Sequence, residues 1–352
     1  MILYRYIARE VLITTLAVSS VLLLVIVGSR FARLLGRVAS GRVSLDVLGQ
    51  LTFLYLPYAA QLILPISFVL ALMLTFGRLY MESEMSVIQS SGVGQRQLLK
   101  MVLVLALLVA SITGLASLYV TPLAQQASTL VMQEQRDRTG FESITPGQFV
   151  QLNRQTVYVD RISEDKAELQ GVFIAQTGRG ENNLALAQTG QQQLDELTRS
   201  RFLLLEQGHR YELPGETLSM TDLSFERYAI RLGVYLPPSV REQVSNMSVA
   251  ELLVYSSRPA LVELQWRLGL PLMLVVMVFI ALPLTRVNPR QGRFMTILPV
   301  LLLQLLFLGG LMSLQDLVNQ GKLPLWPGLW SMHLLFLLLG LLICWRKGVF
   351  IR

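Results

Sequence analysis

The chain has 352 residues, of which 53% are hydrophobic and 15% charged, and its formal net charge is +7. This composition is too apolar for a soluble protein of this length and indicates an integral membrane protein. The single cysteine, Cys344, excludes an intrachain disulfide and a thiolate metal site, and the distant His209 and His333 argue against a histidine cluster, so we expect no metal.

Six uncharged apolar stretches are long enough to cross a bilayer, which takes about 20 helical residues. They lie at 11–28, 51–77, 101–122, 268–285, 294–315 and 323–345. The first stretch follows Arg5 and Arg9 without a small-residue cleavage site, so we expect an uncleaved span. A polar insert of about 130 residues separates the third stretch from the fourth. The sequence therefore predicts three spans, an inserted domain and three further spans.

The distribution of lysine and arginine predicts the orientation of these spans. Basic residues occur at both termini, in 78–100 and in 286–293, which places both termini in the cytoplasm and the insert on the far side. Residues 134–263 carry 13 basic and 18 acidic side chains, a net charge of −5, which leaves +12 for the remainder. The positive charge is thus a membrane-anchoring pattern, and nucleic-acid binding has no support.

One outer segment departs from this pattern, because 28–50 carries Arg30, Arg33, Arg37 and Arg42. Helical periodicity continues past the first span, and at about 100° per residue Arg30, Arg33 and Arg37 fall within about 60° of one another. Guanidinium groups stacked on one face repel each other unless an anion lies among them, and arginine suits bidentate binding of phosphate. We predict a specific anionic ligand; the alternative is snorkelling arginines in contact with ordinary headgroups.

The second span contains Pro57 and Pro65 with Gln61 between them. Proline kinks a membrane helix where neighbouring helices or a cavity can satisfy the freed backbone groups. A glutamine in the middle of a span favours a position that faces the protein interior. Both a kink for packing and a ligand-facing role fit this pattern.

The polar segment 78–100 lies between two long apolar stretches. It carries Glu82 and Glu84 inside a frame of basic residues, and helical periodicity breaks at Gly92 and Gly94. Such a segment predicts a small helix that presents carboxylates to a basic partner. The alternative is a solvated loop that only reverses the chain.

After the third span the apolar period changes from about 3.6 to about 2 residues. Seven β-rich segments follow, at 148–153, 156–160, 171–176, 184–188, 201–208, 209–213 and 218–232. We expect the turns between them at Gly178, Gly180, Asn182, Asn183, Gly190, Pro214 and Gly215, and His209 as a surface residue of a hairpin turn. This spacing favours a sandwich, jelly roll or open barrel. Its residues form no catalytic grouping, so we predict a binding or conduit domain.

The C-terminal part contains two short-range pairs and one buried-span amide. Ser248 and Glu251 have the spacing of a capping box that opens a helix to about residue 256. Glu263 and Arg267 lie four residues apart at the outer edge of the fourth span, and we interpret this pair as structural. Gln304 lies within the fifth span.

Four runs resemble the LptF/LptG (YjgP/YjgQ) permease family of the lipopolysaccharide exporter of Gram-negative bacteria. They are RYIARE at 5–10, QLILPISFVLALMLTFGRLYMESE at 61–84, VELQWR at 262–267 and VNPRQGR at 287–293. The resemblance covers the full length and is weaker in the β-rich insert. The LYMESE and VNPRQGR runs are more similar to the LptF branch than to the LptG branch.

This resemblance implies a non-catalytic permease subunit of an ABC transporter that extracts lipopolysaccharide from the inner membrane and passes it to a periplasmic bridge. The implied partners are LptG as heterodimer, two LptB ATPase subunits and LptC, with LptA as a further candidate. The family's coupling helix, which docks on LptB, falls on Glu82 and Glu84, with Glu84 the main candidate. Lipid A phosphates would lie near Arg30, Arg33 and Arg37, and a lateral gate would use spans one and five of opposite subunits.

No GxxxxGK[ST] motif occurs in the sequence, so ATP would be bound by a partner and we expect no cofactor here. The predicted fold is a membrane protein with six transmembrane helices (3+3) and an inserted all-β, jelly-roll-like periplasmic domain. Residues 1–124 would hold the first three spans and a cytoplasmic coupling helix near 80–92, 125–260 the β domain, and 261–352 the last three spans.

Two other functions remain open from the sequence. A mechanotransmission or scaffold protein would couple a cytoplasmic ATPase to the periplasmic domain without moving a substrate. An intramembrane hydrolase would need paired aspartates or a Ser/His set, whereas the predicted spans contain no acidic residue and Asp316 lies only at the edge of one.

Overall fold

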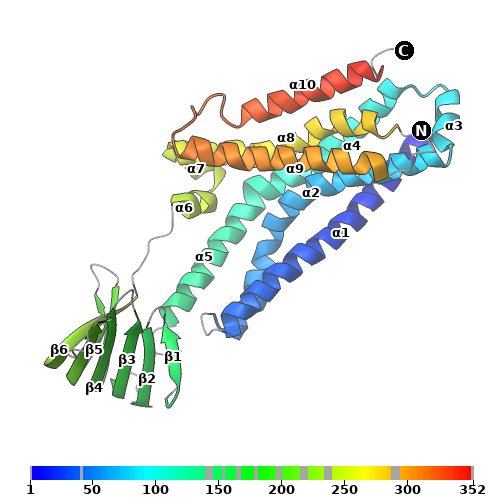
Figure 1. Ribbon diagram of the computed structural model, residues 1–352. Coiled ribbons are helices and arrows are strands. Elements are labelled where there is room, and N and C mark those ends of the chain that lie inside the picture. The colour runs from blue at the N-terminus through cyan, green and yellow to red at the C-terminus, as the bar shows by residue number, and fades with distance from the viewer. Residues whose placement is uncertain are drawn as a thin grey trace. The chain divides into compact units, whose positions relative to one another are not determined.

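The computed structural model describes residues 2–39, 43–138, 146–152, 155–163, 168–177, 181–195, 200–214, 221–233, 240–286 and 294–349. The chain divides into two compact units (Figure 1). The helical unit comprises residues 1–36, 46–129 and 239–352, and the β unit comprises residues 37–45 and 130–238.

The helices follow the chain in numerical order. They are α1 (Ile2–Ala39), α2 (Leu48–Met81), α3 (Glu84–Ser90), α4 (Gln95–Leu115), α5 (Thr121–Arg138), α6 (Val240–Asn246), α7 (Val249–Tyr255), α8 (Arg258–Leu284), α9 (Phe294–Asn319) and α10 (Trp330–Arg346). A π-helical turn, Ala116–Val120, joins α4 to α5. Among the described residues, five continuous helical segments are long and apolar enough to cross a membrane. The prediction of a multi-span membrane protein is confirmed.

The sixth predicted span differs from the structure at its start. The prediction began at residue 323, whereas α10 begins at Trp330 and has 17 residues, about the shortest length that crosses a bilayer. Pro324 and Pro327 cannot donate backbone hydrogen bonds, which explains the late start. The loop before α10 is anchored by Gln265, which donates to the Leu325 carbonyl oxygen (3.2 Å) and accepts from the Leu329 amide (3.1 Å).

The centre of the helical unit is α8, which packs against α2, α4, α9 and α10. One apolar cluster brings residues of α1, α2, α3 and α4 together with α8, and it includes Phe76 and Val102. A second cluster joins α8 to α2, α9 and α10 and includes Phe307 and Phe336. Both clusters converge on α8, so this helix holds the unit together.

The β unit contains one antiparallel sheet. Its described strands are β1 (Phe149–Leu152), β2 (Gln155–Ile162), β3 (Glu168–Thr177), β4 (Glu181–Asp195), β5 (Ser200–Pro214) and β6 (Thr221–Gly233). Each strand pairs with the next, so chain order and sheet order coincide (Figure 1). Alternate side chains on β2 to β5 form a single apolar core. The all-β insert is confirmed, and the jelly-roll-like expectation is refined to a sequential meander within the described residues.

Strands β4 and β5 are longer than predicted. Asn182, Asn183 and Gly190, expected in turns, lie inside β4, and His209 lies inside β5, where it pairs with Leu186 and Ser224. The hairpin prediction at His209 was wrong because the apolar alternation continues on both sides of it. The sequence signal there is Gly208. The residue before it, Gln207, has a left-handed conformation (φ 53°). A Cβ at Gly208 would collide with the Leu186 carbonyl oxygen and the Phe225 ring.

Candidate functional site

The acidic segment predicted to contact a partner forms a separate short helix between α2 and α4. Glu84 is the first residue of α3, and its side chain is half-buried. Met85 and Ile88 anchor α3, since they are buried in the same apolar cluster as Ile7 of α1. Ser83, in a left-handed conformation (φ 60°), turns the chain from α2 into α3. The helix α3 is thus a separate short element, and its apolar side is anchored in the cluster that contains Ile7 of α1.

Polar contacts connect this segment to α1. The Tyr6 hydroxyl donates to Oε2 of Glu84 (3.2 Å), although the two residues are 78 positions apart in the chain. Arg78, in the last turn of α2, donates to the Tyr6 hydroxyl oxygen (3.5 Å) and forms an ion pair with Glu10 (3.0 Å). We call Tyr6, Glu10, Arg78 and Glu84 the polar cluster.

The second predicted carboxylate, Glu82, lies at the C-terminal end of α2. It is exposed, and one of its oxygens lies 3.9 Å from Nε of Arg78. A carboxylate at the start of a helix and another at the preceding turn form an acidic edge, which suits contact with a cationic surface. The structure therefore brings Glu82 and Glu84 to one short segment, and Arg78 touches both this segment and α1.

The three predicted anion-binding arginines lie in the C-terminal part of α1. The Arg30 guanidinium lies over the Tyr55 ring of α2, 5.0 Å from its centroid. Arg33 is exposed, and its Nη1 donates to the Ser29 hydroxyl (3.4 Å). Arg37 is exposed in the last turn of α1. Because α1 is one continuous helix, their spacing keeps the three residues along one face, with Arg33 and Arg37 accessible.

A buried ion pair lies where α6 meets α8. Arg267, 2% exposed, donates from Nε to Glu263 (2.9 Å). Its other nitrogens donate to backbone carbonyl oxygens of Val244, Ser245 and Met247 at the C-terminal end of α6 (2.8 to 3.4 Å). One guanidinium thus satisfies the Glu263 carboxylate, whose side chain is 13% exposed, and the carbonyl groups that a helix end leaves without intrahelical partners.

This ion pair borders a polar cavity of about 250 Å³ between α2, α5, α8 and α9. Gln61, expected to face the interior, is buried in its wall and accepts a hydrogen bond from the Thr121 hydroxyl (3.1 Å). Ser117, in the π-helical turn, also lines it, and its buried hydroxyl finds no partner in the described part of the chain. The lining of amides and hydroxyls around a paired charge suits water or another polar neutral group.

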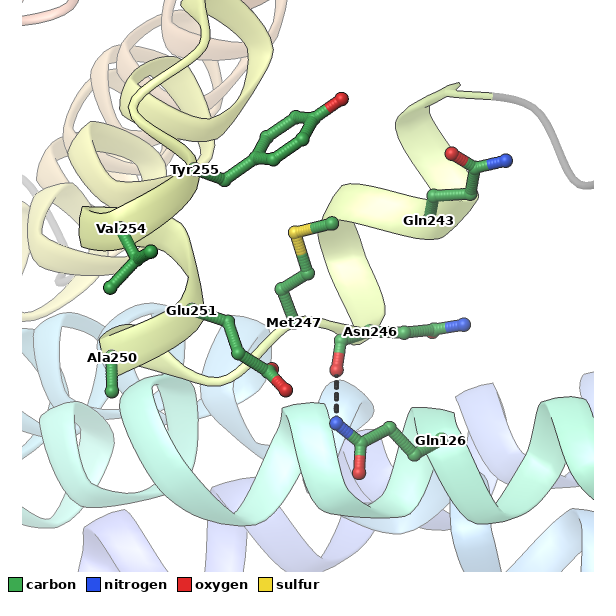
Figure 2. A pocket seen from close by; sticks show the side chains of 8 residues that line it. All are labelled: Gln126, Gln243, Asn246, Met247, Ala250, Glu251, Val254 and Tyr255. Carbon is green, nitrogen blue, oxygen red and sulfur yellow. Dashed lines mark hydrogen bonds between the residues drawn. The ribbon is translucent and has the colours of Figure 1, made fainter.

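A larger, open cavity of about 570 Å³ lies between α5, α6 and α7 (Figure 2). Met247, Val254 and Tyr255 supply its apolar surface. Gln126 donates to the Asn246 carbonyl oxygen (2.6 Å), as the dashed line in Figure 2 marks. Glu251 also borders it, and the pKa of this carboxyl lies below its ordinary value because the Ser248 backbone and side chain bond it within the predicted capping box.

Sequence reasoning found Glu82 and Glu84 but missed the α1 side chains Tyr6 and Glu10, which contact Glu84 and Arg78, respectively. Tyr6 and Glu10 lie four residues apart, so they share one face of α1, but nothing in that spacing identifies Arg78 as their partner. The same holds for Arg267, whose carbonyl partners lie 20 to 23 residues earlier in the chain and are not marked by any local spacing. The VNPRQGR run at 287–293 lies outside the described residues. In the described part of the chain, no cluster of three or more His, Cys, Asp or Glu side chains could hold a metal ion.

Residues 5–346 match the family described as "Lipopolysaccharide export system permease LptF/LptG". The chain is 31% identical over 350 residues to the lipopolysaccharide export system permease protein LptF of Escherichia coli strain K12, and the match covers 97% of this chain and 94% of that protein. The LptF proteins of Escherichia coli O157:H7 and Shigella flexneri match with the same identity and coverage.

Proposed function

This chain belongs to the LptF/LptG family of lipopolysaccharide export permeases, and from that premise we propose that it is a permease subunit of an ABC transporter. In this proposal the subunit takes lipopolysaccharide out of the inner membrane and passes it to a periplasmic bridge. The observation that carries the proposal is the family match across residues 5–346, which includes both helical blocks and the β insert.

Energy must come from outside this chain. Removing acyl chains from a bilayer costs about 0.8 kcal/mol per methylene, so an amphiphile with several acyl chains does not leave unaided. The sequence has no GxxxxGK[ST] motif for binding ATP. We infer that two LptB subunits bind and hydrolyse ATP and that the subunit itself needs no cofactor. The acidic edge of Glu82 and Glu84 supports docking of LptB at α3.

The substrate contact is proposed at Arg33 and Arg37, together with Arg30. Lipid A carries phosphates at headgroup level, and planar guanidinium groups bind phosphate bidentately. Arg33 and Arg37 are exposed, whereas the guanidinium of Arg30 rests on the Tyr55 ring. Arg30 would therefore be the most fixed of the three cations, and the other two would adjust to the ligand.

A second permease subunit, LptG, would complete the membrane part. Only 17% of the most apolar window of α1 and 22% of that of α9 are buried within this chain. These two spans correspond to spans one and five, which the family resemblance assigns to a lateral gate between opposite subunits. The β unit would continue the route toward LptC and LptA, and both termini would be cytoplasmic, with the β unit in the periplasm, as the arginine and lysine distribution favours.

The first test is photo-crosslinking in intact cells, with a photoreactive amino acid at Arg33. Arg9, an exposed arginine near the other end of α1, serves as the matched control position. A lipopolysaccharide adduct at Arg33 and none at Arg9 is expected. An adduct at neither position, with a crosslink detected elsewhere in the assembled complex, would contradict substrate binding at this face and favour a mechanotransmission subunit that moves no lipid.

A further inference from the structure

The polar cluster contains two α1 residues whose contacts are not explained by docking of an ATPase. Tyr6 and Glu10 bind Glu84 and Arg78, respectively, and both lie on α1 rather than on the acidic segment. If α3 only displayed carboxylates, its apolar anchor through Met85 and Ile88 would be sufficient. The contacts instead join the start of α1 to the junction of α2 and α3.

The geometry of the junction concentrates these contacts on Arg78. This side chain lies within 4 Å of Glu10, Glu82 and the Tyr6 hydroxyl at the same time. The side chains of Arg78 and Glu10 are 37% and 33% exposed, so each contact alone is weak in water. A protein that covers Glu84 would exclude water from the cluster and strengthen all of them together.

Helix α1 is less buried in its second half than in its first, although Arg30 rests on the Tyr55 ring there. Its buried residues are Ile7, Val11, Thr15, Ser19 and Leu34, so the helix is held mainly in its first half. No proline interrupts it, and at about 1.5 Å per residue the distance along the helix from Tyr6 to Arg33 is about 40 Å. A continuous helix without a proline kink transmits a shift or tilt of one end to the other as a rigid element.

We propose that Tyr6, Glu10 and Arg78 are positioning residues that make α1 move together with α3 when a partner pushes on Glu84. Through them a force applied on the acidic edge reaches the arginine-bearing end of α1, which is the end proposed to hold the phosphates. The inference rests on the proposed function, because it takes an ATPase at α3 as the source of the force.

The test uses the assembled complex in proteoliposomes that contain lipopolysaccharide. Arg78→Gln, Tyr6→Phe and the conservative Arg78→Lys are compared with two matched controls on α1, Arg9→Gln and Tyr4→Phe. Both control side chains are exposed, and the described part of the chain gives neither a hydrogen bond within the cluster. The measured quantities are ATP hydrolysis, lipopolysaccharide released per ATP, and movement of α1.

Movement of α1 is followed by spin labels on introduced cysteines at Leu24 of α1 and Leu268 of α8, both exposed; the native Cys344 is buried. In the parent complex we expect the label distance to change when ATP hydrolysis is trapped with vanadate. Arg78→Gln should abolish this change in distance and lower the lipopolysaccharide released per ATP about tenfold. Tyr6→Phe should lower the release per ATP about threefold. Both variants should retain ATP hydrolysis. Arg78→Lys should recover part of both, and the controls should match the parent.

Two results would overturn the inference while leaving the proposed function intact. One is an unchanged α1 displacement and an unchanged release per ATP in Arg78→Gln. The other is loss of the ATPase subunit from the purified variant complexes, which would make the cluster part of the docking site alone. Failure of the proposed function is distinguishable, because it would appear as a lack of ATP-dependent lipopolysaccharide release in the parent complex or as normal coupling in Glu84→Arg.

Discussion

Helices α1 and α9 are as apolar as α2 and α8 but are much less buried within the chain. The most apolar windows of the four have mean hydropathies of 2.6, 2.3, 2.1 and 2.2, in that order. The buried share of the same windows is 17% and 22% for α1 and α9, and 67% for both α2 and α8. Hydropathy identifies membrane spans, but it does not separate a central helix from a peripheral one.

The difference follows from how helices associate in lipid. Lipid tails are as apolar as leucine, so close packing and buried polar contacts, rather than removal from water, decide which helices lie inside. Gln61 of α2 and Arg267 of α8 find partners on neighbouring helices. Exposed leucine and valine side chains such as Leu16, Val21 and Leu24 dominate the middle of α1. The anchored pair forms a frame, and the exposed pair is available to lipid or to a second subunit.

The largest expected effect is the loss of stability when Arg267, which links α8 to α6, is replaced. Arg267→Leu leaves Glu263, whose side chain is 13% exposed, without its cationic partner and removes the donors to the α6 carbonyl oxygens. The free energy of unfolding should therefore fall by about 3 to 5 kcal/mol. Unfolding in mixed micelles, followed by tryptophan fluorescence, measures this. Arg258→Leu, an exposed position on the same helix, is the control and should change stability by less than about 0.5 kcal/mol. Equal losses in the two variants would refute the assignment of Arg267 as an anchor.

The same leucine-to-alanine substitution at a buried site of α8 and at an exposed site of α1 tests the difference in burial between these two helices directly. Leu270 of α8 is fully buried, whereas Leu24 of α1 is 77% exposed. Leu270→Ala opens a packing defect and should cost about 2 to 3 kcal/mol, whereas Leu24→Ala should cost less than about 0.5 kcal/mol in the isolated subunit. The same unfolding assay applies. If Leu24→Ala proves as costly as Leu270→Ala, α1 is packed as tightly as α8 and the contrast fails.

The smallest effect concerns the short helix α7, which packs on α8 through the buried Leu252. The pKa of Glu251 is lowered from its ordinary value of 4.5 because the carboxylate accepts from the Ser248 amide (2.6 Å). Because the folded-state pKa is lowered, the charged Glu251 carboxylate stabilises the folded chain at pH values above its ordinary pKa. This stabilisation is lost as the pH falls through the folded-state pKa. The stability difference between the native chain and Glu251→Gln should therefore shrink as the pH falls below the ordinary pKa of 4.5. A difference that does not vary with pH would contradict a charged capping box.

Much of the fold was predictable because its signals are local. Apolar runs mark the spans, the break at Gly92 and Gly94 separates α3 from α4, and Ser248 with Glu251 forms the predicted capping box. Local signals failed where a neighbouring strand or helix decided the outcome. The continuation of β5 through His209 depends on pairing with β4 and β6, and the loop before α10 depends on Gln265 of α8.

The sequence by itself determined the class of protein, the presence of several long apolar segments, the β insert and the acidic segment with Glu82 and Glu84, because composition and periodicity carry that information. Only the tertiary structure decided that α8 is central while α1 is peripheral, and that Tyr6, Glu10 and Arg78 meet Glu84. The physical reason is that a contact between residues 78 positions apart depends on how whole helices pack. No periodicity within either helix records that packing.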